Sequence, residues 1–269
     1  MLKKPIFYIV GYILVFLSVS MLFSLAWSLY YQDGDHVSLI KSIAISLFVG
    51  LASMLIFRSK QKYELTSRDG FAIVTLGWIT MAFFSSLPFY FSVNNDLSFT
   101  NSFFEAMSGL TTNGASILGS ATYQIEDMSK GLLFWRSFTQ FIGGMGIIVF
   151  TIAILPMLGM GGVQLFRAEI AGPSADKLTP RVKQTAKLLW GIYVGFVFIL
   201  ALILKLEGMS WFDAFCHSFA TIATGGFSTQ NASIGSFGPI VQWTIIVFMF
   251  VACSKLLQVY DVENTVSSI

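Results

Sequence analysis

The amino-acid sequence predicts an all-α membrane protein in which an N-terminal helix pair precedes two repeats of helix, re-entrant loop and helix. Its composition is 55% apolar and only 11% charged, whereas soluble domains average about 25% charged residues. Long apolar stretches alternate with two shorter segments, Ser98 to Ser116 and Trp211 to Ser228, which start like helices and end in residues such as Thr and Gly. The formal net charge of +2 gives no indication of a basic surface that binds nucleic acid.

Six apolar stretches are long enough to cross a hydrocarbon core of roughly 30 Å as helices of about 20 residues. They are Ile6 to Tyr30, Ser38 to Phe57, Phe71 to Phe91, Gly131 to Met157, Thr185 to Leu206 and Pro239 to Leu257. The first follows Lys3 and Lys4, as a secretion signal would. Its uncharged run of about 25 residues is too long for a signal segment and no small-residue cleavage site closes it, so we expect it to stay as the first span.

The two shorter segments are expected to enter the membrane and return to the same side. Non-helical backbone at membrane depth is tolerated only where it is buried in protein or lines a watery cavity, because its N–H and C=O groups would otherwise stay unpaired. With six spans and two re-entrant segments, twelve of the 16 Lys and Arg residues fall on the cytoplasmic side. This distribution follows the positive-inside rule and places the N-terminus in the cytoplasm.

The order span, re-entrant segment, span occurs twice, which is the pattern of a pseudo-symmetric channel. An alignment without gaps pairs Phe104 with Phe215 and Gly114 with Gly225. A potassium ion sheds its water only where carbonyl oxygens replace the hydration shell. Glycine permits the dihedral angles that turn successive carbonyls toward one axis, and the C-terminal end of a preceding short helix favours a cation.

These segments resemble the filter loops of the Trk/Ktr/HKT superfamily of potassium transporters, specifically its bacterial Trk branch. The resemblance rests on Phe104 to Ser116, Ala223 to Thr229, Phe134 to Arg136 with Gly143 to Gly146, and Gly172 to Ser174 with Lys177 to Arg181. It implies potassium uptake through a narrow filter, with potassium as the substrate and no covalently bound cofactor. By resemblance, the only metal site is the filter, formed by Thr111, Thr112, Asn113, Gly114, Ala115, Ile222, Ala223, Thr224, Gly225 and Gly226.

The resemblance also implies a location and partners. Proteins of this branch lie in the bacterial inner membrane, dimerise and dock a cytoplasmic nucleotide-binding regulatory subunit. We therefore expect a multi-pass homodimer in the lipid bilayer that binds such a subunit and no nucleic acid.

Family members carry four such repeats, and two are found here. The predicted organisation is a helix pair with a cytoplasmic loop at 1–69, a first repeat at 70–157, a cytoplasmic linker at 158–184, a second repeat at 185–258 and a tail that departs from the family pattern at 259–269. Because two strands cannot encircle an ion, a truncated product, a fragment and an assembly of two copies all stay open.

Potassium conduction is the leading function. A nonconducting fragment and a potassium–sodium symporter subunit are the alternatives, since filter geometry decides between the two ions. The sequence contains neither His-Glu-x-x-His nor Gly-x-Ser-x-Gly, so an enzyme is not expected.

Two polar residues within apolar segments have competing interpretations. Arg136 is a candidate pore-regulating residue, because an intramembrane charge is a functional hypothesis by default. Alternatively, it snorkels to the outer interface or pairs with Glu126 or Asp127. His217 is either a proton relay or a histidine that packs between helices, and packing is favoured.

Acidic residues and glycines near the loops also have structural interpretations. Glu105 and Asp213 either draw cations toward the pore or anchor the short helices. For Glu105, a buried hydrogen-bonding role is favoured because it lies deep in its segment. Close packing of helices is expected at Gly143, Gly144 and Gly146.

Overall fold

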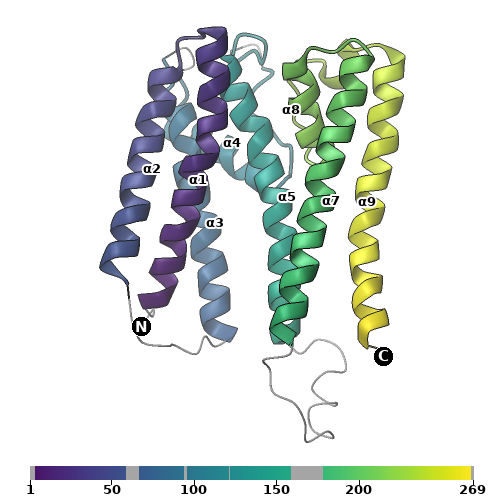
Figure 1. The fold of residues 1–269 in the computed structure, drawn as a ribbon. Coiled ribbons are helices and arrows are strands. Elements are labelled where there is room, and N and C mark those ends of the chain that lie inside the picture. The colour runs from purple at the N-terminus through teal and green to yellow at the C-terminus, as the bar shows by residue number, and fades with distance from the viewer. Residues whose placement is uncertain (1–3, 59–66, 94–95, 121, 159–177, 268–269) are drawn as a thin grey trace, which may run out of the picture.

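The computed structural model describes residues 4–58, 67–93, 96–120, 122–158 and 178–267. Within these ranges the regular structure is entirely helical, as the sequence predicts, with long helices around two short ones (Figure 1). The long helices are α1 (Lys4–Tyr31), α2 (His36–Ile56), α3 (Ser67–Tyr90), α5 (Lys130–Leu158), α7 (Leu178–Leu206) and α9 (Pro239–Ser267). The short ones are α4 (Phe99–Leu110) and α8 (Trp211–Ile222), with a 3-10 turn, η2, at Ser233–Ser236.

Among the residues that the structure describes, four helices are long and apolar enough to cross a membrane. They are Lys4–Tyr31, His36–Ile56, Arg68–Tyr90 and Lys187–Leu206, and α9 adds a shorter apolar helix over Pro239–Cys253. Large apolar side chains project outward from them, such as Phe48 at 74% exposure and Phe250 at 78%. Exposed apolar surface of this kind is expected against lipid.

Helices α1 and α2 form an antiparallel pair that is fastened to the first repeat. A Cβ atom at Gly11 would lie 2.9 Å from the carbonyl oxygen of Gly50, so only glycine allows this approach. In the turn between the helices, Asp33 accepts a hydrogen bond from the Gly131 N–H at 2.7 Å, and Asp35 accepts one from the Val93 N–H at 3.1 Å. The helix pair is thereby joined to the start of α5 and the end of α3.

The short helices α4 and α8 occupy only one end of the bundle, the upper half of Figure 1. Each begins at a serine N-cap: Ser98 Oγ accepts from the Asn101 N–H at 3.2 Å, and Ser210 Oγ accepts from the Asp213 N–H at 3.0 Å. Each contains 12 residues and is therefore about 18 Å long, too short to cross a bilayer. The helical part of each predicted re-entrant segment is present.

Helix α5 contacts both short helices, and two of its glycines lie close to the neighbouring helices α4 and α7. A Cβ at Gly143 would lie 1.8 Å from the Leu110 carbonyl oxygen, and one at Gly144 would lie 2.4 Å from the Tyr193 hydroxyl. The predicted packing role is confirmed for both. Gly146 has a looser contact, 3.8 Å from Trp78.

Two helix ends differ from the expected boundaries. Helix α7 begins at Leu178, inside the predicted linker 158–184, because Pro180 is tolerated in a first helical turn. Helix α9 continues to Ser267, through most of the predicted tail, since residues 258–267 contain neither Gly nor Pro to end it. The middle of the linker, residues 159–177, lies outside the described residues, and so does the motif Gly172 to Ser174.

Candidate functional site

The backbone turns in the same way after α4 and after α8. Thr112 and Thr224 both have φ of 54°, and the residues two positions later, Gly114 and Gly226, have φ of 75° and 81°. A β-branched residue in the left-handed region is unusual and strained. Its occurrence at both sites shows that the two loops are built alike.

Backbone hydrogen bonds closing the two short helices match as well. In the first loop, the Thr112 N–H bonds to Gly109 and the Asn113 N–H bonds to Ser108, both at 3.0 Å. In the second, the Thr224 N–H bonds to Thr221 at 3.0 Å and the Gly225 N–H bonds to Ala220 at 2.8 Å.

This geometry corrects the predicted alignment of the repeats by one residue. Gly114 corresponds to Gly226, and the pairing of Gly114 with Gly225 is wrong. The second loop has two adjacent glycines, and the sequence alone does not say which one adopts the left-handed conformation. The N-cap residues Ser98 and Ser210 keep the corrected spacing, so the whole helix–loop unit is equivalent.

The two loops touch each other directly. A Cβ at Gly114 would lie 2.1 Å from the Gly225 carbonyl oxygen, and one at Gly225 would lie 2.4 Å from the side chain of Gln140 on α5. Gly114 also has positive φ, so both its conformation and its surroundings require glycine. The loops therefore lie side by side with α5 behind the second.

The predicted filter residues fall into exposed and covered groups. Exposed residues are Thr111, Asn113, Ala115, Thr224 and Gly226. Half-buried or buried residues are Thr112, Gly114, Ile222, Ala223 and Gly225.

Two of the predicted filter residues are associated with the short helices: Ile222 belongs to α8, and Ala115 turns its carbonyl toward α4. Ile222 is the last residue of α8, and in the corrected register Phe227 takes its place in the set. The Ala115 carbonyl accepts a hydrogen bond from Ser108 Oγ at 2.5 Å, so it faces α4.

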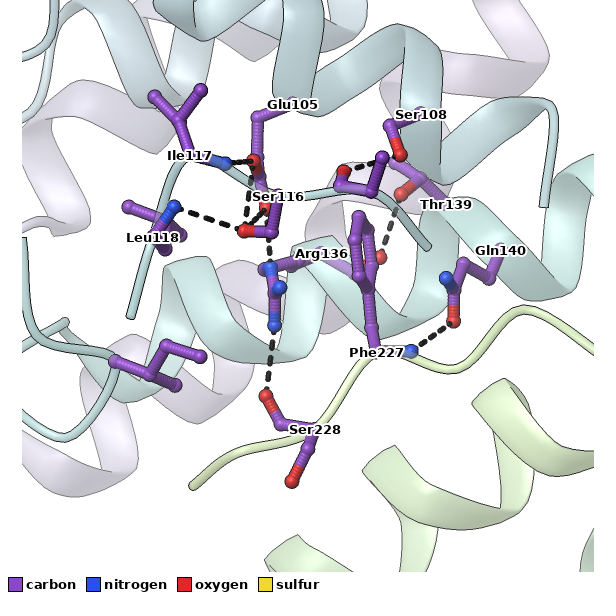
Figure 2. A network of polar contacts seen from close by, with 12 residues as sticks. Glu105, Ser108, Ser116, Ile117, Leu118, Arg136, Thr139, Gln140, Phe227 and Ser228 are labelled. Atoms are coloured by element: carbon purple, nitrogen blue, oxygen red, sulfur yellow. Dashed lines mark hydrogen bonds and ion pairs between the residues drawn. The ribbon is translucent and has the colours of Figure 1, made fainter. Parts of the chain in front are cut away.

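Arg136 lies at the centre of a polar network behind the loops (Figure 2). Its Nε donates to Glu105 Oε1 at 2.6 Å, and its Nη1 donates to the Ser228 carbonyl at 2.8 Å. The guanidinium carbon lies 3.8 Å from the ring centroid of Phe227, and the residue is 2% exposed. Snorkelling and pairing with Glu126 or Asp127 are both wrong, because α4 presents a buried carboxylate on the inner side of α5.

The two acidic residues of the short helices act as anchors. Glu105 is 1% exposed and also accepts from Ser116 Oγ at 2.9 Å and the Ile117 N–H at 3.2 Å, which confirms the buried hydrogen-bonding interpretation. Asp213 accepts from Ser210 Oγ at 2.6 Å and from Thr229 Oγ1 at 2.7 Å. It thus fastens the start of α8 to the end of its loop.

His217 occupies in the second repeat the position of Glu105 in the first. Its Nδ1 lies 2.8 Å from the Asp213 carbonyl and its Nε2 lies 3.0 Å from Ser228 Oγ. A carbonyl only accepts, so Nδ1 carries the hydrogen and Nε2 accepts from the Ser228 hydroxyl. The ring is buried and lies edge-on to Phe237, in agreement with the packing interpretation.

Three residues that hold the loops were not selected from the sequence. Ser116 and Ser228 are bonded to Glu105 and His217, and the Gln140 Oε1 accepts from the Phe227 N–H at 3.3 Å. The two serines are equivalent in the corrected register, so the repeat itself contained a signal for them. For Gln140 the sequence held no such signal.

The outer ends of the repeats are also bonded to each other. The Asn231 N–H donates to Glu126 Oε1 at 2.7 Å, and Asn231 Oδ1 accepts from the Ile125 N–H at 3.0 Å. The Asn231 amide additionally contacts Gln124. The segments that follow the two loops are thus bonded to each other, in addition to the contacts that the loops make with α5.

Long apolar helices around two similar helix–loop units define an all-helical protein of the multi-pass membrane class. The family model TrkH, described as a cation transport protein, matches residues 36–254. The chain belongs to this family of cation transport proteins.

Similar proteins come from several bacteria. The Trk system potassium uptake protein TrkH of Vibrio parahaemolyticus is 45% identical over 258 residues, which cover 94% of this chain and 52% of that protein. The Escherichia coli K12 protein of the same name is 44% identical over 247 residues, covering 91% and 50%.

A solved structure agrees with the fold. The crystal structure of the potassium transporter TrkH from Vibrio parahaemolyticus matches with a TM-score of 0.78 at 41% identity, covering 91% of this chain and 48% of that one. The chain therefore spans about half the length of the relatives it matches.

Proposed function

We propose that the chain contributes two backbone strands to a potassium-selective filter and serves as part of a potassium uptake system. The observation that carries this proposal is the shared left-handed geometry of Thr112–Gly114 and Thr224–Gly226, in two loops that touch. Such geometry turns successive carbonyl groups toward one side, where they can replace the water around a cation. The relatives' names, potassium uptake proteins, support potassium as the ion.

The short helices favour a cation at the loops. Helices α4 and α8 both end at the loops, and the C-terminal end of a helix carries partial negative charge. Two strands supply only half of a ring around an ion. Two further strands would complete it, either from a second copy of this chain or from further repeats of a longer protein.

The proposed location is the bacterial inner membrane with the N-terminus in the cytoplasm. The start of α1 and the end of α9 lie at the same end of the bundle, opposite α4 and α8 (Figure 1). Most Lys and Arg residues are predicted at that end, which fits the positive-inside rule. We further propose a homodimer that docks a nucleotide-binding regulatory subunit, as the resemblance to the Trk branch implies, and no enzymatic activity.

Potassium flux into liposomes containing the purified chain tests the proposal. Gly114→Ser and Gly225→Ser should abolish flux, because each added Cβ would overlap the neighbouring loop or Gln140. Gly195→Ser is the matched control, since nothing lies within 4 Å of its Cβ position. Flux that is unchanged in both loop variants would refute the filter assignment, and a wild-type chain without flux would favour the nonconducting alternative.

A further inference from the structure

The charged pair behind the loops joins the two repeats to each other. Glu105 belongs to the short helix of the first repeat and holds Ser116 and Ile117 of the first loop. Arg136 binds Glu105 and, with the same guanidinium group, the carbonyl of Ser228 in the second loop. A single guanidinium therefore connects the segments that leave both loops.

The second loop is fixed at Phe227, which contacts both Arg136 and Gln140 of α5. Phe227 follows the left-handed Gly226, lies under the Arg136 guanidinium at 3.8 Å, and donates its N–H to Gln140, one helical turn further along α5. Movement of Arg136 would therefore move the backbone next to Gly226. The carbonyl directions proposed to select the ion depend on that backbone.

These contacts of Arg136 with Glu105, Phe227 and Ser228, here called the clamp, differ from the corresponding contacts in the second repeat. His217 replaces Glu105 there and bonds to Ser228 through its ring. The charged connection is thus made by the first repeat, and it reaches across to the second. A planar guanidinium can donate in two directions and stack on a ring at once, which a lysine ammonium cannot do.

We propose that Arg136 is a positioning residue that sets ion selectivity by fixing the two loops relative to each other through Glu105, Phe227 and Ser228. This inference rests on the proposed filter function and assigns to Arg136 the discrimination between potassium and sodium. Arg136 itself does not contact the ion.

The test compares potassium and sodium flux through the full chain in liposomes. Arg136→Lys keeps the buried charge pair with Glu105 but loses the Ser228 bond and the stacking on Phe227. We expect the protein to fold and its potassium-to-sodium flux ratio to fall about tenfold, the size of effect that one charge-assisted hydrogen bond produces. Lys130→Met is the control, because Lys130 lies on the same helix over Phe212 and away from the loops, and it should leave the ratio unchanged.

A second variant removes both charges. Glu105→Gln combined with Arg136→Met leaves no unpaired buried charge and should also lower the flux ratio. If wild type is selective and both variants keep its ratio, the clamp is overturned and the filter proposal stands. If wild type does not discriminate between the ions, the proposed function fails and the clamp's selectivity role fails with it.

Discussion

At the scale of single residues, the site depends on two threonines held at positive φ. Each left-handed, β-branched residue costs about 1–2 kcal/mol of conformational strain. Thr112 and Thr224 keep this conformation because the surrounding hydrogen bonds of the helix ends fix it. The same strain in both loops is expected where a backbone is fixed for function.

Replacing Thr112 by glycine should relieve that strain. We expect Thr112→Gly to leave the free energy of unfolding unchanged or to raise it by up to about 1 kcal/mol, because glycine adopts positive φ freely but is more flexible when unfolded. Thr111→Gly is the control: Thr111 has φ of −81°, so it should only destabilise. Denaturant unfolding in detergent measures the free energy of unfolding of both variants. Equal destabilisation by Thr112→Gly and Thr111→Gly would contradict the strain at Thr112.

His217 offers a separate test, of packing against proton transfer. His217→Ala should lower the free energy of unfolding by about 1–3 kcal/mol, since it leaves the buried Ser228 hydroxyl without its acceptor. His217→Asn can still donate to the Asp213 carbonyl, but it cannot relay protons. Flux should survive in the asparagine variant, and loss of flux with normal stability would instead favour a relay.

At the scale of elements, the position of α4 depends on its contact with α5. The last carbonyls of α4 lie against Gly143, and its side chain Glu105 lies against Arg136. Helix α5 is therefore the support on which the first loop rests. A substitution on α5 that displaces α4 should therefore also displace the first loop, although the substituted residue does not belong to that loop.

Gly143→Ala tests this support. The added Cβ would lie 1.8 Å from the Leu110 carbonyl oxygen, and backbone cannot move aside cheaply, so we expect a loss of about 1–3 kcal/mol together with reduced flux. Gly195→Ala, in open surroundings, should instead gain up to about 1 kcal/mol from better helix propensity. Thermal unfolding of the two variants should shift in opposite directions, and parallel shifts would argue against the contact.

The sequence predicted elements better than contacts. Apolar length located the long helices, and a helix-like start followed by residues such as Thr and Gly located both short ones. The end of α9 was missed because the polar residues after Leu257 do not look like a span although they form a helix. The partner of Arg136 was missed because Glu105 is 31 residues away, and only the packing of α4 on α5 brings them together. The predicted alignment of the two repeats was wrong by one residue, because Gly225 and Gly226 were equally plausible partners of Gly114.

At the scale of the whole molecule, two sets of contacts join the repeats: one at Asn231, after the second loop, and one at Arg136 on α5. Asn231 bonds to the outer segment of the first repeat, and Arg136 joins the loops from behind. Asp33 and Asp35 fasten the N-terminal helix pair to the first repeat. Together these bonds make one body from three sequence segments.

Asn231→Ala should loosen the outer connection between the repeats. We expect a loss of about 1 kcal/mol or more in the free energy of unfolding, the typical value of a solvent-accessible hydrogen bond or two. Gln230→Ala is the neighbouring control, because the backbone of Gln230, not its side chain, bonds to Ser228. Thermal unfolding that is equally affected in both would mean that the outer bonds contribute nothing specific.

The most direct measurement is the water accessibility of the two loops in the membrane. In a background with Cys216 and Cys253 replaced by alanine, Asn113→Cys and Thr224→Cys should both react with a charged, membrane-impermeant thiol reagent added from outside, more slowly when potassium is present. Phe48→Cys, on the outward face of α2, should stay unreactive. If Asn113→Cys and Thr224→Cys resist the reagent as Phe48→Cys does, neither loop lines an aqueous path and the account of a shared filter is contradicted.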